Sequence, residues 1–359
     1  MNRRGFFFID FGLLAPALIL AIFGLATLFS ISIALFVTQF IYIVIGLLMF
    51  FIFCHFNYKV LHTYAAPIYI FSIIVLVFVL ILGLETRGAV RWIEIFGLNI
   101  QFSEILKPML LISFASFLSK SKKTFKRFFL TFVFLFPIGF LIYAQPDLGN
   151  ALIYAAVTVV TMFVYGFPIL WFIIGSTGLI VLAPLFWQFL RDYQKQRILT
   201  FFHPTSDPLG TSYNAIQAII AVGSGMFFGK GLGQATQSSL RFLPERHTDF
   251  IFATLTESFG FVGGVFIIVV FIFLLYRIFV LYESSEDAFR KIFSVGAFLL
   301  LVFQFFLNIG MNIGITPIVG VTLPFVSYGG SSAIASFILL GILSSFSANL
   351  KNKDVLEIR

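Results

Sequence analysis

The sequence contains very little cysteine, histidine and charge. Of its 359 residues one is cysteine, four are histidine, and 11% are charged. The single cysteine, Cys54, excludes an internal disulfide, and its place in an apolar run is typical of a small packed hydrophobe. The histidines have no ligand spacing that links them, which argues against a zinc site. We therefore expect neither cross-links nor a zinc cluster to organise this chain.

Apolar residues take the place of charge. They make up 60% of the chain, 52 residues are Phe, and the mean hydropathy is +1.05. A soluble core cannot use this composition, which is typical of polytopic membrane proteins. A membrane span needs about 20 apolar residues. Runs of that order lie near residues 11–33, 36–54, 67–84, 103–119, 128–143, 149–166, 170–190, 250–281, 292–313 and 331–348. We therefore expect an all-α polytopic integral membrane protein with about ten transmembrane helices, forming a single domain over residues 1–359.

Basic residues indicate the orientation in the membrane. The first run is too long for a signal-peptide core, so we expect an uncleaved helix with a cytoplasmic N-terminus. Most of the 23 Lys and Arg residues, including the cluster at 120–127, then lie inside, as does the C-terminus. The exceptions, on or facing the outer side, are Arg87, Arg91, Lys107, Arg191, Lys195, Arg197, Lys230, Arg241 and Arg246. Either they bind something anionic, or long translocated loops simply tolerate charge, an alternative that does not apply to Lys107 because it falls within a span. The net charge of +8 forms no basic stripe with interleaved aromatics, so we expect no nucleic acid partner.

A long extracytoplasmic loop, about 191–249, separates the seventh and eighth predicted spans. Its semi-apolar part, Ser212–Val222, predicts an amphipathic helix at the membrane interface. The Gly-rich part, Gly223–Gly233, can cradle phosphate through backbone N–H groups with Lys230 adding charge, but it lacks a full P-loop signature. A second irregular segment, Gly314–Ser332, contains Pro and paired Gly. It cannot be a regular span, so it must line a cavity or be covered by protein.

Ionisable residues are concentrated between Arg241 and Glu257, where an apolar run begins. One interpretation is structural, because Thr248 or Asp249 can N-cap a helix that starts at Phe250. The other is catalytic. Glu257 either sits in a cavity or pairs within the bundle, since it points roughly 80° away from Asp249 on an ideal helix.

Two further sites lie at or near membrane depth. Glu104 and Lys107 are three residues apart within a span, so they share a helix face and can pair. Such a pair either serves a function or merely fixes helix packing. Pro108 restricts Lys107 and favours a kink there. Asp147 occupies an outer turn and reads locally as a helix N-cap.

Several motifs resemble the SEDS family (shape, elongation, division and sporulation proteins). The segment Phe242–Ala253, with the order Phe-Leu-Pro-Glu-Arg-His-Thr-Asp-Phe-Ile-Phe-Ala, is similar to the family signature. The other matching motifs, in family order over nearly the whole chain, are Arg91-Trp92, Ser103-Glu104-x-x-Lys107, Gln145–Gly149, Asp207–Gly210, Gly223–Gly225, Gly229–Gly231, Thr236–Ser238 and Leu323–Ser331. Thr236–Leu240 and Glu245–His247 resemble the elongation branch more than the division branch.

The resemblance implies a peptidoglycan glycosyltransferase of the bacterial cytoplasmic membrane that polymerises lipid II into β-1,4 strands on the extracytoplasmic side. It implies that Asp249 is the general base, that undecaprenyl diphosphate leaves, and that Mg²⁺ or Mn²⁺ joins Asp249. Implied partners are the nascent glycan strand and a class B penicillin-binding protein, a transpeptidase. Candidate substrate-binding residues are Arg91, Glu104, Lys107, Asp147, Arg197, Lys230, Glu245, Arg246, His247, Thr248 and Ser327. The alternative is a lipid II flippase that uses the same cavity, which the one-sided distribution of polar residues disfavours.

Overall fold

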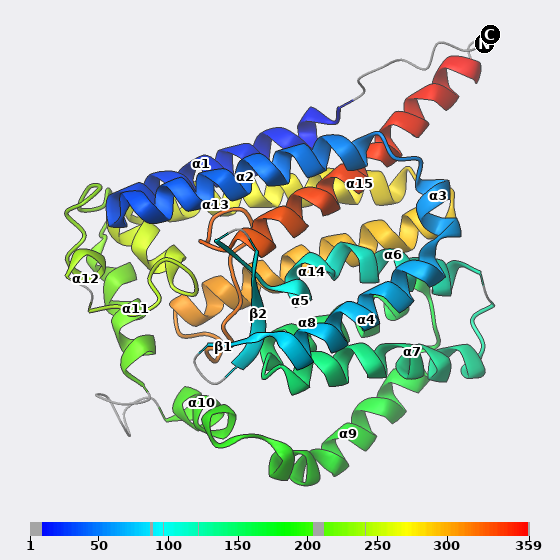
Figure 1. The fold of residues 1–359 in the computed structure, drawn as a ribbon, viewed down its shortest axis with the longest axis horizontal. Helices are drawn as coiled ribbons and strands as arrows, with labels where there is room; N and C mark the ends of the chain where they lie inside the picture. Colours follow the sequence, from blue (N-terminus) through cyan, green and yellow to red (C-terminus); the bar gives the residue numbers. More distant parts are fainter. Residues whose placement is uncertain are drawn as a thin grey trace.

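The computed structural model describes residues 9–86, 89–95, 97–120, 122–203, 212–240 and 242–357, which form a helical bundle with a small sheet (Figure 1). Among these residues, ten helical stretches are long and apolar enough to cross a membrane. They are α1 (Phe11–Ile31), α2 (Ile33–Cys54), α4 (Ala65–Leu82), α5 with α6 (Phe102–Ile105 and Lys107–Ser119), α7 (Phe125–Ala144), α8 (Leu148–Tyr165), α9 (Ile169–Phe189), α13 (Ile251–Glu283), α14 (Ala288–Asn312) and the Gly330–Ser347 part of α15 (Gly330–Glu357). The ten predicted spans are therefore confirmed, with edges correct to a few residues.

Local sequence accounts for several helix ends. The Asp10 side chain accepts a hydrogen bond from the Gly12 N–H at the start of α1, and Gly166, with φ 96°, ends α8 in the left-handed conformation that glycine tolerates. In the fourth span Pro108 lies in the first turn of α6, and Leu106 separates α6 from α5. The break expected beside Lys107 is therefore present.

The helices differ greatly in how much they are covered. The membrane-spanning part of α15 is completely buried and packs against α2, whereas α9 buries none of its apolar window and stands at the edge of the bundle (Figure 1). Shorter helices connect the spans: α3 (Tyr58–Thr63), α10 (Asp192–Phe202), α11 (Tyr213–Ser224) and α12 (Thr236–Ser239). The helix expected over Ser212–Val222 corresponds to α11, which packs against α13.

A three-stranded antiparallel sheet, which the all-α expectation did not include, links α4 to α5. It consists of β1 (Leu84–Thr86), β2 (Ala89–Ile95) and β3 (Leu98–Ile100) in the order β1-β2-β3. Val90 and Ile93 are β-branched and Trp92 is aromatic, which suits a short strand. The segment 84–100 between α4 and α5 is also too short to show the apolar periodicity of a helix in its sequence.

The helix α13 is broken at Gly260, where φ is 72° and ψ is −169°. The Gly-rich loop at 225–231 fills the break and satisfies the backbone groups that it frees. Hydrogen bonds cross between them from Phe261 N–H to Met226 O (2.8 Å), from Val262 N–H to Phe227 O (3.2 Å), from Lys230 N–H to Glu257 O (3.0 Å) and from Gly231 N–H to Ser258 O (3.0 Å). A Cβ atom at Gly229 would collide with the Ser258 carbonyl, so this approach requires glycine.

Candidate active site

The charged segment before α13 packs against the irregular connection 313–329 between α14 and α15. The His247 carbonyl accepts a hydrogen bond from the Tyr328 N–H at 2.8 Å, and the Thr248 carbonyl accepts one from Ser327 Oγ at 2.8 Å. The His247 and Tyr328 rings also lie 5.5 Å apart. Several residues of 313–329 are buried, including Ser327, so this broken backbone is covered by protein as expected.

Asp249 is held through its backbone by two asparagines of α14. Its carbonyl accepts hydrogen bonds from Asn308 Nδ2 and Asn312 Nδ2, both at 3.0 Å. The N-cap of α13 is Phe250, which makes no side-chain capping bond, and the Ala253 N–H donates to Asn312 Oδ1 at 2.9 Å. The interpretation of Thr248 or Asp249 as the helix cap is therefore wrong, because Asn312 supplies the capping oxygen.

The Asp249 carboxylate lies beside a basic side chain from the long loop. A Cβ atom at Gly320 would lie 3.5 Å from Asp249 Oδ2 and 3.9 Å from Arg197 Nη1, so both atoms border the same point. Arg197 belongs to α10, and its guanidinium also lies 5.5 Å from the Tyr193 ring centre. Gly320 has φ 70°, a conformation that favours glycine. Because Gly320 carries no side chain, nothing from this residue separates the carboxylate from the guanidinium.

The remaining predicted residues of this segment form its turn. Thr248 Oγ1 lies 3.2 Å from Glu245 Oε2, and the Glu245 carbonyl accepts from the Thr248 and Phe250 N–H groups. The Arg246 carbonyl accepts from Thr254 Oγ1 at 3.0 Å. Nearby, burial raises the pKa of Tyr328 above its ordinary value.

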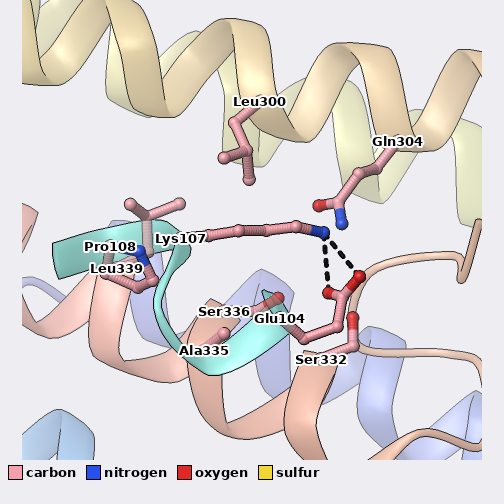
Figure 2. A pocket seen from close by; sticks show the side chains of 9 residues that line it. All are labelled: Glu104, Lys107, Pro108, Leu300, Gln304, Ser332, Ala335, Ser336 and Leu339. Carbon is pink, nitrogen blue, oxygen red and sulfur yellow. Dashed lines mark hydrogen bonds and ion pairs between the residues drawn. The ribbon is translucent and has the colours of Figure 1, made fainter. Parts of the chain in front are cut away.

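The Glu104–Lys107 pair lies in a second, buried place (Figure 2). Lys107 Nζ contacts both Glu104 carboxylate oxygens at 2.7 Å, and the two residues are 2% and 6% exposed. Their pairing is therefore confirmed. The adjoining cavity of about 10 Å³ has room for roughly one water molecule. Gln304 of α14 also lines it, and the Gln304 Oε1 atom is buried without a hydrogen-bond partner (Figure 2).

Asp147 acts as the N-cap of α8, as its local sequence indicated. Its side chain accepts from the Asn150 N–H at 3.3 Å, from Asn150 Nδ2 at 2.8 Å and from Gln101 Nε2 at 2.7 Å. Ser103 Oγ lies 3.2 Å away. Asp147 is 3% exposed, so these bonds replace the water that its carboxylate loses on burial.

Lys230 pairs with Glu257, which settles the position of Glu257 within the bundle. Lys230 Nζ lies 3.2 Å from Glu257 Oε1, and the fully buried Glu257 carboxylate also accepts from Ser238 Oγ at 2.8 Å. The N–H groups of Gln237 and Ser238 donate to the same carboxylate. The Lys230 and Gly231 backbone N–H groups donate to carbonyls of α13, so this part of the Gly-rich loop anchors the loop to that helix.

The structure therefore brings together Arg197, Asp249, the Glu245–Thr248 turn and Ser327. It places the Glu104–Lys107 pair, Asp147 and Lys230 in separate clusters. Arg91 lies in β2, but its side chain is outside the described residues, as are Arg87, Arg241 and the 207–210 motif. Sequence reasoning missed Asn308, Asn312 and Gln304. Their spacing of four residues within an apolar span is the signal that marks them.

Within the described ranges, no group of three or more His, Cys, Asp or Glu residues converges to hold a metal ion. Mg²⁺ commonly binds one or two carboxylates together with substrate phosphates. Asp249 can serve as such a carboxylate, with the substrate phosphates supplying the other ligands.

Comparison with known proteins identifies the family. The family model described as a cell cycle protein (FtsW, RodA and SpoVE) matches residues 6–352. Peptidoglycan glycosyltransferase MrdB of Escherichia coli (strain K12) is 38% identical over 314 residues, which cover 86% of this chain and 84% of that protein. Stage V sporulation protein E of Bacillus subtilis (strain 168) is 34% identical over 322 residues, 86% of each chain.

Two solved structures share the fold over almost their whole length. A chain of a peptidoglycan synthase complex, studied for the coordination of polymerization and crosslinking, is 29% identical with a TM-score of 0.83, over 96% of this chain and 99% of that one. The rod shape determining protein RodA of Thermus thermophilus is 28% identical with a TM-score of 0.71, over 94% of this chain and 97% of that one. The family match over 6–352 and these similarities show that the chain belongs to the FtsW/RodA/SpoVE family, the SEDS proteins.

Proposed function

We propose that this chain is a peptidoglycan glycosyltransferase that polymerises lipid II into β-1,4 glycan strands during cell elongation. Its relatives include a peptidoglycan glycosyltransferase, and its structural neighbours include RodA and a chain of a peptidoglycan synthase complex. The observation that carries the proposal is the Asp249 carboxylate beside the Arg197 guanidinium at Gly320. A base and a cation at one point suit a reaction that removes a proton and releases an anion.

In the proposed reaction Asp249 acts as the general base. Its carboxylate takes the proton of the acceptor GlcNAc C4 hydroxyl while that oxygen bonds to C1 of the donor MurNAc. The bond from C1 to the diphosphate oxygen breaks, and its electron pair leaves with undecaprenyl diphosphate, so the anomeric centre inverts. General base catalysis is typically worth about 10²–10⁴-fold. Arg197 then stabilises the negative charge that develops on the departing diphosphate.

The other candidates take supporting roles in binding. Glu245, Arg246, His247, Thr248 and Ser327 form the turn and wall around Asp249, so we assign them to the sugar and diphosphate. Lys107 and Glu104 line a cavity that is smaller than a sugar, so substrate must enlarge it to use them. Asp147, Lys230 and Arg91 remain proposed substrate contacts.

We also propose a divalent cation, a partner and an orientation. Asp249 would hold Mg²⁺ or Mn²⁺, which would supply charge neutralisation for the leaving group. A class B penicillin-binding protein is the proposed partner, which the likeness to a synthase complex of polymerization and crosslinking supports. The positive-inside rule supports cytoplasmic termini and an extracytoplasmic Asp249 in the bacterial cytoplasmic membrane.

The test is polymerisation by the purified protein. Wild type with lipid II and Mg²⁺ or Mn²⁺, with and without the partner, is expected to make glycan strands that resolve on a gel. Asp249→Asn keeps the size of the side chain but loses the base, so strand synthesis should fall by about 10²–10⁴-fold. Asp192→Asn, an exposed substitution in the same loop, is the matched control and should polymerise normally.

Normal polymerisation by Asp249→Asn contradicts the assignment of the base. If wild type makes no strands and instead moves lipid II across a vesicle bilayer, the flippase alternative replaces the proposal.

A further inference from the structure

Three amide side chains follow one face of α14. Gln304, Asn308 and Asn312 are four residues apart and are 1%, 0% and 0% exposed. An amide buried at membrane depth costs free energy unless hydrogen bonds replace those to water. Gln304 faces the Lys107 cavity (Figure 2), whereas Asn308 and Asn312 reach Asp249. This polar face therefore extends from the buried ion pair to the candidate base.

Asn312 replaces a hydrogen bond of the helix. In a regular helix the Ala253 N–H would donate to the Asp249 carbonyl four residues earlier. Here the Ala253 N–H donates to Asn312 Oδ1 at 2.9 Å, and Asn312 Nδ2 donates to the Asp249 carbonyl at 3.0 Å. The Asn312 side-chain amide thus bridges the Ala253 N–H and the Asp249 carbonyl. It keeps both satisfied while Asp249 stays outside the helix.

Asn308 links Asp249 to the opposite wall of the site. Its Nδ2 donates to the Asp249 carbonyl at 3.0 Å and to the Val321 carbonyl at 2.7 Å. Val321 follows Gly320, the residue beside which the Asp249 carboxylate and Arg197 lie. One buried amide therefore fixes the backbone that carries the base and the backbone that borders it. Asn312 Nδ2 also donates to the Asn308 main-chain carbonyl at 2.7 Å, and it lies 3.5 Å from Asn308 Oδ1, so the two asparagines are linked.

We propose that Asn308 and Asn312 are positioning residues that set the location of the Asp249 carboxylate for proton abstraction. This inference rests on the proposed function. A carbonyl has two lone pairs, and the two amides occupy both on Asp249, so its main chain is fixed without using its carboxylate. A displacement of about 1 Å at a reacting group can cost on the order of 10²-fold in rate. Losing either amide is therefore expected to lower turnover rather than substrate affinity.

The experiment measures kcat and KM for lipid II polymerisation together with thermal unfolding in detergent. Asn308→Leu has similar size but no donor. Asn312→Asp keeps an oxygen for the Ala253 N–H and loses the amide donor to Asp249. For each we expect kcat to fall roughly 10–100-fold with KM changed less than about 3-fold. Ser294→Ala, at a fully buried position of the same helix, is the matched control and should keep the wild-type kcat.

Two readouts separate positioning from stability. Asn308→Ser retains one donor, so its kcat should lie between those of wild type and Asn308→Leu. In Asn312→Asp, lowering the pH protonates the introduced carboxylate, and the O–H of the neutral acid can donate again. Its kcat relative to wild type should therefore rise as pH falls. A loss confined to the yield or melting temperature of folded protein, with unchanged kcat per folded molecule, overturns the inference.

The outcome also distinguishes this inference from the proposed function. If Asp249→Asn polymerises normally, the assignment of the base fails, and the asparagines have no base to position. If Asp249→Asn is inactive while Asn308→Leu and Asn312→Asp both keep the wild-type kcat, the base stands and the positioning role is wrong.

Discussion

Asp10 and Asp249 precede two of the membrane-spanning helices, and they lie near opposite ends of α13. Asp10 is held through its carboxylate, which accepts from Arg277 Nη2 at 2.8 Å, Arg277 Nε at 3.1 Å and the Gly12 N–H at 3.0 Å. Asp249 is held through its carbonyl by two buried asparagines. A carboxylate fixed by its own oxygens joins helices. When the residue is instead fixed through its main-chain carbonyl, its position does not depend on what the carboxylate oxygens contact. This arrangement suits a base whose carboxylate must change partners.

Glu257 lies at the same end of α13 as Asp249 and can be compared with it directly. Although it is only eight residues away, it resembles Asp10, because its carboxylate is held by Lys230, Ser238 and two N–H groups. Two acidic residues eight positions apart are therefore held differently: Glu257 through its side chain, and Asp249 through its main chain.

Glu104 is a further carboxylate held through its own oxygens, by Lys107, and this pair is buried and lines a cavity. We expect the largest effect on stability and activity here. Lys107→Met leaves the Glu104 charge unpaired, and breaking a buried pair costs about 3–5 kcal/mol of stability. Polymerisation should be lost with it. The double variant Glu104→Gln with Lys107→Met carries no charge, so its melting temperature should recover while polymerisation stays absent. Recovery of both would mean that the pair only fixes helix packing.

An intermediate effect is expected at Lys230 and Glu257. If they act as one structural pair, Lys230→Met and Glu257→Gln should be non-additive in stability, with a coupling of about 0.5–3 kcal/mol in a double-mutant cycle. The KM for lipid II in the Glu257→Gln background should then not change further on adding Lys230→Met. An equal rise in KM in both backgrounds would instead establish Lys230 as an independent substrate contact.

The smallest effect on turnover is expected at Asp10. Asp10→Asn weakens the contact that ties α1 to α13, so the melting temperature in detergent should fall. The kcat per folded molecule should stay at the wild-type value, in contrast to Asp249→Asn. A loss of kcat without a change in melting temperature would remove the distinction between the two kinds of carboxylate.

Much of the fold was predictable from the sequence, because the length and hydropathy of an apolar run are enough to predict a membrane span. Thus all ten spans, the break near Pro108 and the pairing of Glu104 with Lys107 followed from local patterns. The cap of α8 by Asp147 did so as well. The small sheet did not, because its strands are too short to show a period.

The candidate site was only partly predictable, since its contacts join distant segments. Asp249 and Ser327 were named from motifs, but the sequence does not reveal that Asn308 and Asn312 converge on one carbonyl. Nor does it reveal that Glu257 takes up Lys230, because that contact depends on the loop 225–231 entering the break of α13. The four-residue spacing of Asn308 and Asn312 marks them as a polar face of the helix, but it does not show which distant groups they contact.

The break at Gly260 has a consequence for how the protein tolerates change. Since the hydrogen bonds of α13 are completed by residues 226–231, this loop behaves as part of the helix even though Met226 and Phe228 are about 80% exposed. An insertion or a protease site placed between Met226 and Gly231 would leave the amides and carbonyls of α13 around Gly260 without these partners. We therefore expect this accessible tip to be among the worst positions in the chain for a tag.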